Sequence, residues 1–520
     1  MENGGRAMKG TSRETQSAPV GACPPTLELT PRLEWFKERL DRCYDAVFHT
    51  FTIGRGLPCV LIYFQGMFDY LNAEEHLLMP LLRESSERVD EPAGLFDEHR
   101  IPLARTIVID DPDEAIKQVM MGHGVLLQEN EAQMLVLPFV SYETRALEEA
   151  PNESVIRGPR EAFVESLDTN LTLLRRRIKS PLLKTERLTF GVHTQTSVIL
   201  AYLEGTCPDR LIREVKRRLA NIRIDGVLGS SYLEEIIQDS PYSPFPQLQY
   251  TERPDTVSAS VLEGRIAILV DNTPMILLAP VTFFMMLQSA EDYYQPFIAA
   301  SWIRWIRFIF LSTSLLLPSF YIAITTFHPE MIPFNLLISI SSSREIVPFP
   351  ALMEAAMMEL AFEALREASV RIPKSIGQAV SIIGALIIGT AAVQAGIVSA
   401  AMVIIVSVTG IASFIIPNFD LGLSFRLLRF PMMLLAGMFG IFGIACGIIL
   451  IYVHLVNLQS FGTPYLAPVT PRAARSLKDT VYRAPWWKMR TLPFMANRTN
   501  RLREIANMRA WASSEGADDE

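Results

Sequence analysis

The chain has 520 residues, of which 49% are hydrophobic and 20% are charged, and its formal net charge is −8 at pH 7. This length allows roughly two to four domains. The five scattered cysteines, without a CxxC pair, support neither a disulfide framework nor a zinc site. The net charge excludes little, because acidic and basic residues are concentrated in different parts of the chain.

Residues 1–30 are predicted to be a disordered leader. They contain Gly, Ser, Thr and Pro but not the apolar core of a signal peptide. Without such a signal, we expect the domains that follow to be cytoplasmic.

Two α/β subdomains are predicted next, at residues 31–142 and 153–265. In the first, RLEWFKERLDRCYDAVF has helical periodicity and LPCVLIYFQG is typical of a buried strand. Asp111 is placed to cap a helix that has Pro112 in its first turn. In the second subdomain, TSVILAYLEG predicts a strand and DRLIREVKRRLANI an amphipathic helix.

Residues 266–460 are predicted to form a polytopic all-α transmembrane domain. No Asp, Glu, Lys or Arg occurs in residues 375–419, a run of about 45 residues and roughly two bilayer crossings. The strongest predicted spans are Trp302–Phe327, Ile376–Gln394, Val398–Ile416 and Phe430–Val456.

Two weaker segments leave the number of hydrophobic segments open at four to six. TPMILLAPVTFFMMLQSA is short and contains Pro280, so it is equally consistent with an interfacial, re-entrant or spanning segment. The other is FPALMEAAMMELAFEALREASVRIP, Phe349–Pro373, which carries four glutamates. The tail, residues 461–520, is basic next to the last span, which favours a cytoplasmic C-terminus and an even number of spans.

No catalytic motif is present. The sequence contains no GxxxxGK[ST], HExxH or GxSxG pattern and no GxGxxG after a predicted strand. We therefore expect a protein that is not an enzyme and that binds no cofactor or metal.

Three glutamates mark one side of the helix predicted at Phe349–Pro373. Glu359, Glu363 and Glu367 are four residues apart and lie within an arc of ~80°, because each residue advances a helix by ~100°. One interpretation is an interfacial helix whose acids are paired or hydrated. The other is a water-filled, cation-selective path lined by the acids of several subunits. Gln394, a polar residue in a dry span, is a further candidate for the ion path.

A second stripe consists of small residues. Gly377, Ser381, Ala385 and Gly389 recur every four residues and present one continuous face, as in helices that pack closely in lipid. Such a face serves helix packing within one chain or between subunits, and both remain open.

Several long blocks together resemble the A subunits of bacterial spore germinant receptors, the GerA family. They include VIRGPREAFVESLDTNLTLLRRRIKSPLL, YTERPDTVSASVLEGRIAILVDNTP, SAEDYYQPFIAASWIRWIRFI and the glutamate-bearing segment itself. The resemblance runs in order from about Glu148 to about Pro468. One departure is Ser399-Ala400, where the family pattern has Ser-Pro between two spans.

This resemblance implies a multi-pass protein of the spore inner membrane, with the N-terminal region and the tail in the cytoplasm. It also implies a receptor complex with a transporter-like B subunit and a lipoprotein C subunit. The A subunit would assemble into a homo-oligomer, a pentamer, and form a germinant-gated cation channel that triggers germination. On this basis we predict that Glu359, Glu363 and Glu367 set the cation preference.

Other functions compete with that of a channel. A secondary transporter is disfavoured, because no inverted repeat is evident. A non-conducting scaffold subunit of the receptor complex remains an alternative, and so does a paralogous channel-type protein of the dipicolinic-acid release machinery, which shares YTERPD-like and RWIRFI-like stretches. We expect no nucleic-acid binding, because the basic tail is explained by its place beside the membrane.

Overall fold

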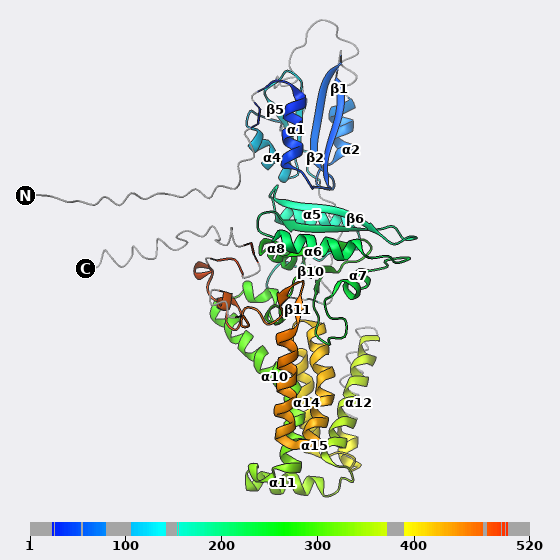
Figure 1. Ribbon diagram of the computed structural model, residues 1–520, viewed down its shortest axis with the longest axis vertical. Coiled ribbons are helices and arrows are strands. Elements are labelled where there is room, and N and C mark those ends of the chain that lie inside the picture. Colours follow the sequence, from blue (N-terminus) through cyan, green and yellow to red (C-terminus); the bar gives the residue numbers. More distant parts are fainter. Residues whose placement is uncertain are drawn as a thin grey trace, which may run out of the picture. The chain divides into compact units, whose positions relative to one another are not determined.

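The computed structural model describes ten stretches of the chain (Figure 1). The described residues are 23–24, 26–53, 56–79, 106–141, 153, 155–371, 389–471, 476–489, 491–493 and 496–497. The chain divides into two compact units. One comprises Met1–Arg145 and Leu171–Glu186, and the other comprises Ala146–Asn170 and Arg187–Glu520.

The first unit is built around an antiparallel sheet with the strand order β1-β2-β4-β5-β3. Its strands are β1 (Ala46–Ile53), β2 (Leu57–Phe64), β3 (Ile107–Ile109), β4 (Gly124–Gln128) and β5 (Met134–Leu137). The helices described with it are α1 (Leu29–Arg39), α2 (Tyr70–Ala73), η1 (Glu74–Leu78) and α4 (Pro112–Met120). Asp111 caps α4, as the sequence predicted, because its Oδ1 accepts a hydrogen bond from the N–H of Asp113 at 3.0 Å.

The two faces of this sheet bury separate hydrophobic cores, because successive residues of a strand point to opposite faces. Val60 and Ile62 of β2 pack with Trp35 and Phe36 of α1 on one face. Leu61 packs on the other face, with residues of α2 and η1. The apolar run predicted as a buried strand is therefore buried on both sides.

The second sheet has the strand order β6-β7-β9-β10-β8. Its strands are β6 (Leu183–Phe190), β7 (Thr196–Leu203), β8 (Gln249–Thr251), β9 (Ile266–Val270) and β10 (Ile276–Ala279). Strands β9 and β10 continue the sheet past the boundary predicted at residue 265, so TPMILLAPVTFFMMLQSA begins as a strand and does not span a membrane. A short apolar run is consistent with a buried strand and with a membrane segment. Here the hydrogen-bonded pairing of β10 with β8 and β9 shows that the run is a strand.

Three helices accompany the second sheet: α6 (Asp209–Ala220), α7 (Ser230–Ile237) and α8 (Pro254–Leu262). Most of helix α5 (Leu167–Arg177) belongs to the first unit, where Arg175 pairs with Asp45 at 2.8 Å. Helix α6 is amphipathic, and its buried residues Val215 and Leu219 pack on the sheet beside Leu200. The sequence YTERPD places Arg253 directly before α8. There its buried guanidinium pairs with Asp255 at 2.7 Å.

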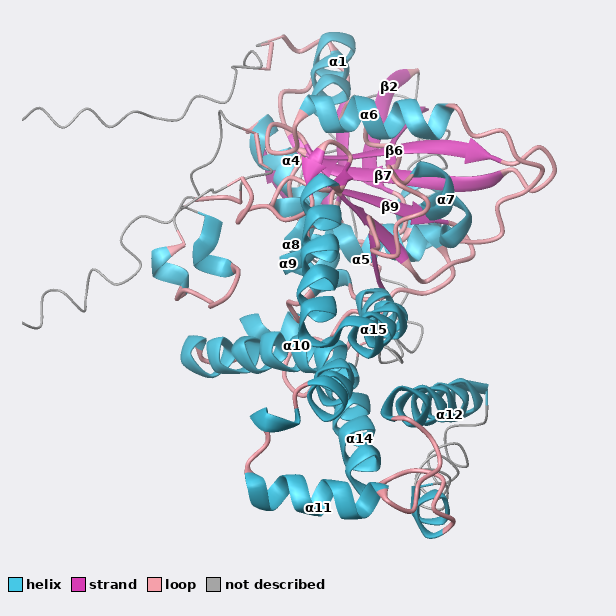
Figure 2. Ribbon diagram, turned by 60° about the horizontal axis from the view of Figure 1, so that its bottom comes forward, coloured by secondary structure: helices cyan, strands magenta, loops and turns pink. Residues whose placement is uncertain are grey.

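The rest of the described chain is mainly helical (Figure 2). Its helices are α9 (Phe283–Met286), η2 (Ala290–Tyr293), α10 (Phe297–Phe327), η3 (Pro329–Met331), α11 (Phe334–Arg344), α12 (Ala351–Arg371), α14 (Ala400–Phe414) and α15 (Phe419–Asn457). The short elements after them are β11 (Gln459–Ser460), β12 (Thr463–Pro464), η4 (Ser476–Asp479) and η5 (Trp486–Lys488). Among the described residues, α10 and α15 are long and apolar enough to cross a membrane, and α14 is apolar but shorter.

Helix α15 doubles back at Gly440. This residue has φ 61° and ψ −141°, outside the helical region. A Cβ atom on Gly443 would overlap the Leu435 carbonyl, and one on Gly447 would overlap the Met432 side chain, so residues 419–439 and 441–457 run antiparallel. The prediction of one span at Phe430–Val456 is therefore wrong, because a glycine inside an apolar run leaves no break in the hydrophobic pattern.

The open end of this hairpin lies beside the loop before β8, where His454 and Ser243 are hydrogen-bonded at 2.8 Å and the Ser424 hydroxyl donates to the Pro244 carbonyl. Its tip lies against the end of α10, because a Cβ on Gly440 would be 3.1 Å from Phe327. Each half of the hairpin therefore runs the length of the helical region.

Among the remaining predicted spans, Trp302–Phe327 lies within α10, and Val398–Ile416 overlaps α14. The span predicted at Ile376–Gln394 lies mostly outside the described residues, which resume at residue 389.

Candidate functional site

Helix α12 carries the glutamates that the sequence singled out, and it packs against α10, α14 and α15. Its sequence is rich in Ala, Met, Leu and Glu and contains no Gly or Pro, which favours an uninterrupted helix. Glu359 is buried in these contacts, Glu363 is half-buried, and Glu367 is exposed. The three predicted acids therefore lie in three different environments.

Glu359 forms a buried ion pair with Arg429 of α15. The Nε of Arg429 also donates to the carbonyl oxygen of Ser314 in α10, at 2.8 Å. One carboxylate oxygen of Glu359 and one terminal nitrogen of Arg429 find no hydrogen-bond partner among the described residues. A buried charge is costly unless it is paired, so this pair fixes α10, α12 and α15 to one another at one level.

Glu363 is shared between two arginines. Arg426 of α15 approaches its carboxylate at 3.1 Å, and Arg366 of α12 itself approaches at 3.6 Å. Arg366 also donates to the Ser413 hydroxyl of α14 at 2.7 Å. This half-buried group connects α12 to both α14 and α15.

Glu354, which the sequence placed off the acidic arc, makes a third buried link. Its carboxylate pairs with Arg344 of α11 at 3.3 Å and accepts a hydrogen bond from the N–H of Ser399 at 2.9 Å. The Ser399 hydroxyl in turn caps α14 by accepting from the N–H of Met402 at 3.3 Å. The cap starts α14 without the proline of the family pattern.

We call these three links the α12 ladder: Glu354–Arg344, Glu359–Arg429 and Glu363–Arg426. The ladder neutralises each acid with an arginine from another helix. It can hold α11, α12 and α15 in register, and an acid in it could meet a passing cation only after its arginine moves away.

Sequence reasoning missed the arginine side of the ladder. A signal was present for two of its members, because Arg426 and Arg429 are three residues apart in a predominantly apolar helix. Residues at this spacing lie on one helix face, and charges inside an apolar span point to a protein interior or to water.

The other predicted site residues are only partly within the described chain. Gly389 is buried, and a Cβ on it would meet Val403 of α14 at 3.4 Å, an ordinary contact distance. Gln394 is exposed. Gly377, Ser381 and Ala385 lie outside the described residues, so their predicted packing role stays a prediction.

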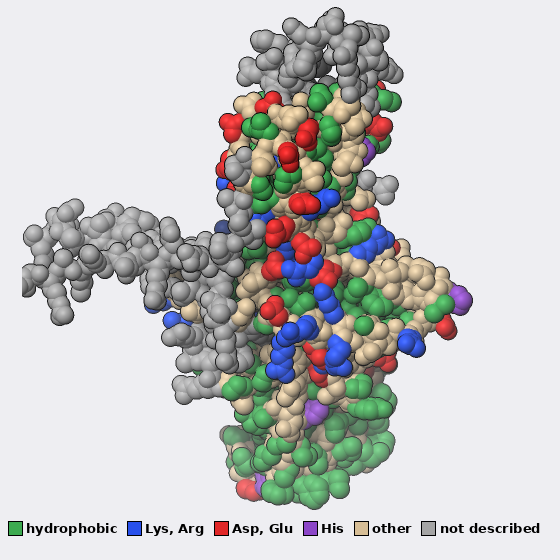
Figure 3. All heavy atoms as spheres, turned by 45° about the horizontal axis from the view of Figure 1, so that its top comes forward, with side chains coloured by type: hydrophobic (Ala, Val, Ile, Leu, Met, Phe, Trp, Pro, Cys, Tyr) green, Lys and Arg blue, Asp and Glu red, His purple; other side chains and the backbone are tan. Residues whose placement is uncertain are grey.

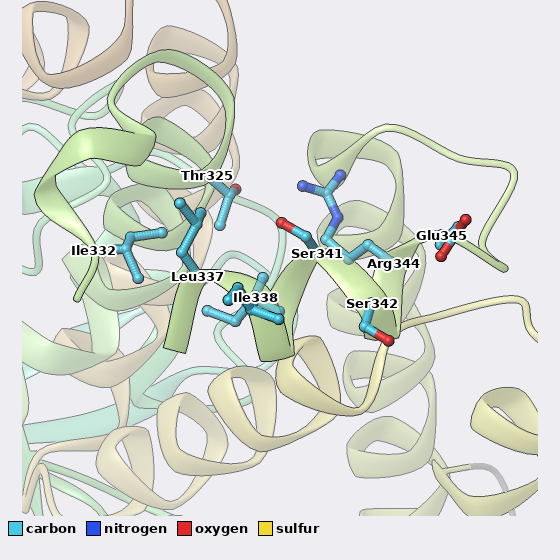
Figure 4. Close-up of a pocket in the computed structure, with 9 residues that line it drawn as sticks. Thr325, Ile332, Leu337, Ile338, Ser341, Ser342, Arg344 and Glu345 are labelled. Carbon is cyan, nitrogen blue, oxygen red and sulfur yellow. The ribbon is translucent and has the colours of Figure 1, made fainter. Parts of the chain in front are cut away.

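A hollow of about 750 Å³ lies between the end of α10 and helix α11 (Figure 4). Its apolar lining comes mainly from Ile332, Leu337 and Ile338, and its polar lining includes Ser341 and Arg344. Because Arg344 also belongs to the α12 ladder, this hollow adjoins the Glu354 link.

Comparison with known proteins gives a consistent result. A family model described as Bacillus/Clostridium GerA spore germination protein matches residues 34–495. The membrane protein YfkQ of Bacillus subtilis is 46% identical over 477 residues, which cover 92% of this chain and 93% of that protein. Spore germination protein KA of Bacillus subtilis is 41% identical over 475 residues, which cover 91% and 87%.

Among solved structures, the N-terminal domain of the A subunit of the Bacillus megaterium spore germinant receptor GerK3 is 31% identical, with a TM-score of 0.41. The match covers 51% of this chain and 99% of that domain.

Proposed function

The chain belongs to the GerA family of spore germination proteins, and from this premise we propose that it is the A subunit of a nutrient germinant receptor in the inner membrane of bacterial spores. Its partners would be a transporter-like B subunit and a lipoprotein C subunit.

A multi-pass arrangement is supported by the helical part of the second unit. Helix α10 ends against the tip of the α15 hairpin, and the hairpin opens beside the loop before β8. Its two halves contain 21 and 17 residues, about 32 and 26 Å at 1.5 Å per residue, and the hydrocarbon core of a bilayer is about 30 Å thick. We infer that both halves cross the membrane, with the sheets and the tail on the cytoplasmic side.

The α12 ladder is the observation that supports a conducting role. Carboxylates persist inside a membrane domain when they face protein or water, and such residues commonly mark ion paths. We infer that several copies, a pentamer, surround a cation path and that α12 borders it. The pairs of the ladder would then belong to a closed state, and opening would separate acids from arginines.

The test is a conductance measurement on the purified oligomer in a planar bilayer, with Glu363→Gln and Glu367→Gln as variants and exposed Glu345→Gln as the control. A cation channel whose preference for cations falls several-fold in the first two variants, and is unchanged in the control, is the expected result. Unchanged selectivity in all variants would remove these acids from the path.

A non-conducting scaffold is the second candidate, because Glu354, Glu359 and Glu363 are already paired within one chain. In this case the oligomer would give no conductance with or without its partner subunits. Spores carrying the variants would still release monovalent cations at the wild-type rate when the germinant is added.

A further inference from the structure

One face of α10 is apolar and uncovered from its first turn. Ile298, Trp302, Trp305 and Ile309 are 71%, 66%, 53% and 61% exposed. Their spacing of four, three and four residues places them within a narrow arc of one helix. Two exposed tryptophans in such a stripe are unusual on a surface that faces only water.

The opposite face of α10 is held by buried charges. Arg304 and Arg307 both reach the buried carboxylate of Asp292 in η2, each at 2.8 Å. Arg304 also pairs with Asp479 at 2.8 Å. These contacts fix the rotation of α10, so the two arginines point inward while Trp302 and Trp305 point outward.

The C-terminal segment, residues 476–489, lies beside this stripe. The N–H of Arg483 donates to the hydroxyl of Ser301 at 3.1 Å, and the rings of Trp487 and Phe297 are 5.9 Å apart. Ser301 precedes Trp305 by one helical turn, so the segment runs along the flank of the stripe. The segment itself exposes Lys478, Tyr482, Trp486 and Lys488.

The length of α10 places the stripe at a membrane surface. Its 31 residues extend about 46 Å at 1.5 Å per residue, whereas the hydrocarbon core is about 30 Å thick. Its last residue lies at the tip of the α15 hairpin, so the surplus length belongs to its beginning. In Figure 1 this beginning lies to the side of the upright helices α14 and α15.

We propose that residues 297–309 and the C-terminal segment form one surface that lies in the headgroup region of the bilayer, with Trp302 and Trp305 as its anchors. Tryptophan is suited to this region, because its ring is apolar and its N–H can be hydrated. Lysines at the same level meet lipid phosphates. In Figure 3 the hydrophobic side chains cover the helical part below a zone in which Lys, Arg, Asp and Glu side chains are mixed. This inference rests on the proposal that α10 crosses a membrane.

The test uses the full chain in nanodiscs of phosphatidylcholine and phosphatidylglycerol. Trp35, Trp486, Trp487 and Trp511 are replaced by Phe, so that only Trp302 and Trp305 fluoresce. The lipids carry bromine either near the glycerol end or near the chain end, and bromine quenches tryptophan at contact. We expect about twofold stronger quenching by the shallow bromines. A variant that retains only Trp35, which is buried in the first unit, is the matched control and should not be quenched.

Stronger quenching by the deep bromines would overturn the inference, because the stripe would then lie in the hydrocarbon core. An absence of quenching would overturn it as well, by assigning the stripe to water or to a protein partner. Resistance of the chain to extraction from membranes by alkaline carbonate separates the two proposals. An extracted chain contradicts the proposed membrane protein, whereas a retained but unquenched chain contradicts only the headgroup surface.

Discussion

Arg429 shows how a single side chain can determine the arrangement of three helices. It is buried in α15, pairs with Glu359 of α12 and donates to the Ser314 carbonyl of α10. Removing one member of a buried pair leaves the other charge without compensation, whereas removing both leaves only a loss of packing. The single change should therefore cost more stability than the double change.

We predict that Arg429→Gln lowers the stability of the helical part by about 3–5 kcal/mol, because Glu359 is then buried without a counter-charge. The double variant Glu359→Gln with Arg429→Gln should recover most of this loss. Thermal unfolding of the purified protein in detergent measures both, with exposed Glu345→Gln as a neutral control. If the double variant were no more stable than Arg429→Gln, the uncompensated charge of Glu359 would not be the cause of the lost stability.

A second prediction concerns Glu153, whose carboxylate accepts a hydrogen bond from the Thr251 hydroxyl at 2.8 Å. Burial raises its pKa to about 7. A raised carboxyl pKa means that the folded state favours the neutral acid. Its contribution to stability is complete below the unfolded pKa of about 4.5 and is lost as the pH rises through about 7.

The second sheet should therefore lose up to about 3 kcal/mol of stability between about pH 4.5 and pH 7 through this one group. Glu153→Gln, which does not titrate, should flatten the pH dependence. Amide hydrogen exchange in β8 and β10, followed across this range, measures the effect. Equal slopes in the variant and the wild type would argue that Glu153 is charged in the folded protein at all of these pH values.

For the ion pairs of α12, the sequence predicted the glutamates but not the arginines with which they pair. The helix with Glu359, Glu363 and Glu367 follows from local propensity and spacing, and α12 confirms the helix. Pairing with Arg426 and Arg429 depends on how α15 packs against α12, 60 to 70 residues along the chain. No periodic pattern in one sequence specifies such a pairing.

Among the elements, the α15 hairpin departs furthest from its prediction. Gly440 adopts a backbone conformation that only glycine enters readily, with φ 61° and ψ −141°. A Cβ atom there would also lie 3.1 Å from Phe327 and 3.2 Å from His328. The turn therefore requires glycine for its backbone and for its close approach to the end of α10.

Gly440→Ala should destabilise the helical part by about 2 kcal/mol or more, because strain in this region and the tight contact add to each other. Gly389→Ala is the matched control, because its Cβ would meet Val403 at an ordinary 3.4 Å. The melting temperatures of both variants in detergent decide the point. If the two alanines were equally tolerated, residues 419–457 would have to form a straight helix in the folded protein.

The span predicted across Gly440 is wrong and the helix cap predicted at Asp111 is confirmed, and both outcomes have one explanation. A helix start is marked by local chemistry, an Asp before Pro112, and the structure confirms that cap. The reversal inside α15 has only one glycine among many in an apolar segment, and Gly443 and Gly447 differ from it in no sequence feature. Only the folded hairpin distinguishes them, because Gly440 forms the turn whereas Gly443 and Gly447 lie where the two halves are in close contact.

For the whole molecule, the proposal that α10 crosses a membrane predicts, from the helical contacts, which parts lie on the same side of it. The C-terminal segment is tied to the start of α10 by Asp479 and Arg304, at 2.8 Å. The open end of the α15 hairpin is tied to the loop before β8 by His454. Helix α11 follows the other end of α10, so it should lie on the far side.

We therefore predict that a cysteine at Lys478 and a cysteine at Ser342 of α11 are labelled from opposite sides of sealed vesicles. Both positions are exposed, so a membrane-impermeant maleimide can reach them if it is on the correct side. Lys37→Cys in the first unit should follow Lys478→Cys, because the same proposal places the sheets and the tail together. The natural cysteines are replaced by Ser to remove background, and permeabilised vesicles give the full signal for each variant. Labelling of Ser342→Cys and Lys478→Cys from the same side would contradict a membrane-crossing α10. Lys478 lies in the segment that is tied to the start of α10, and Ser342 lies in the helix that comes after its end.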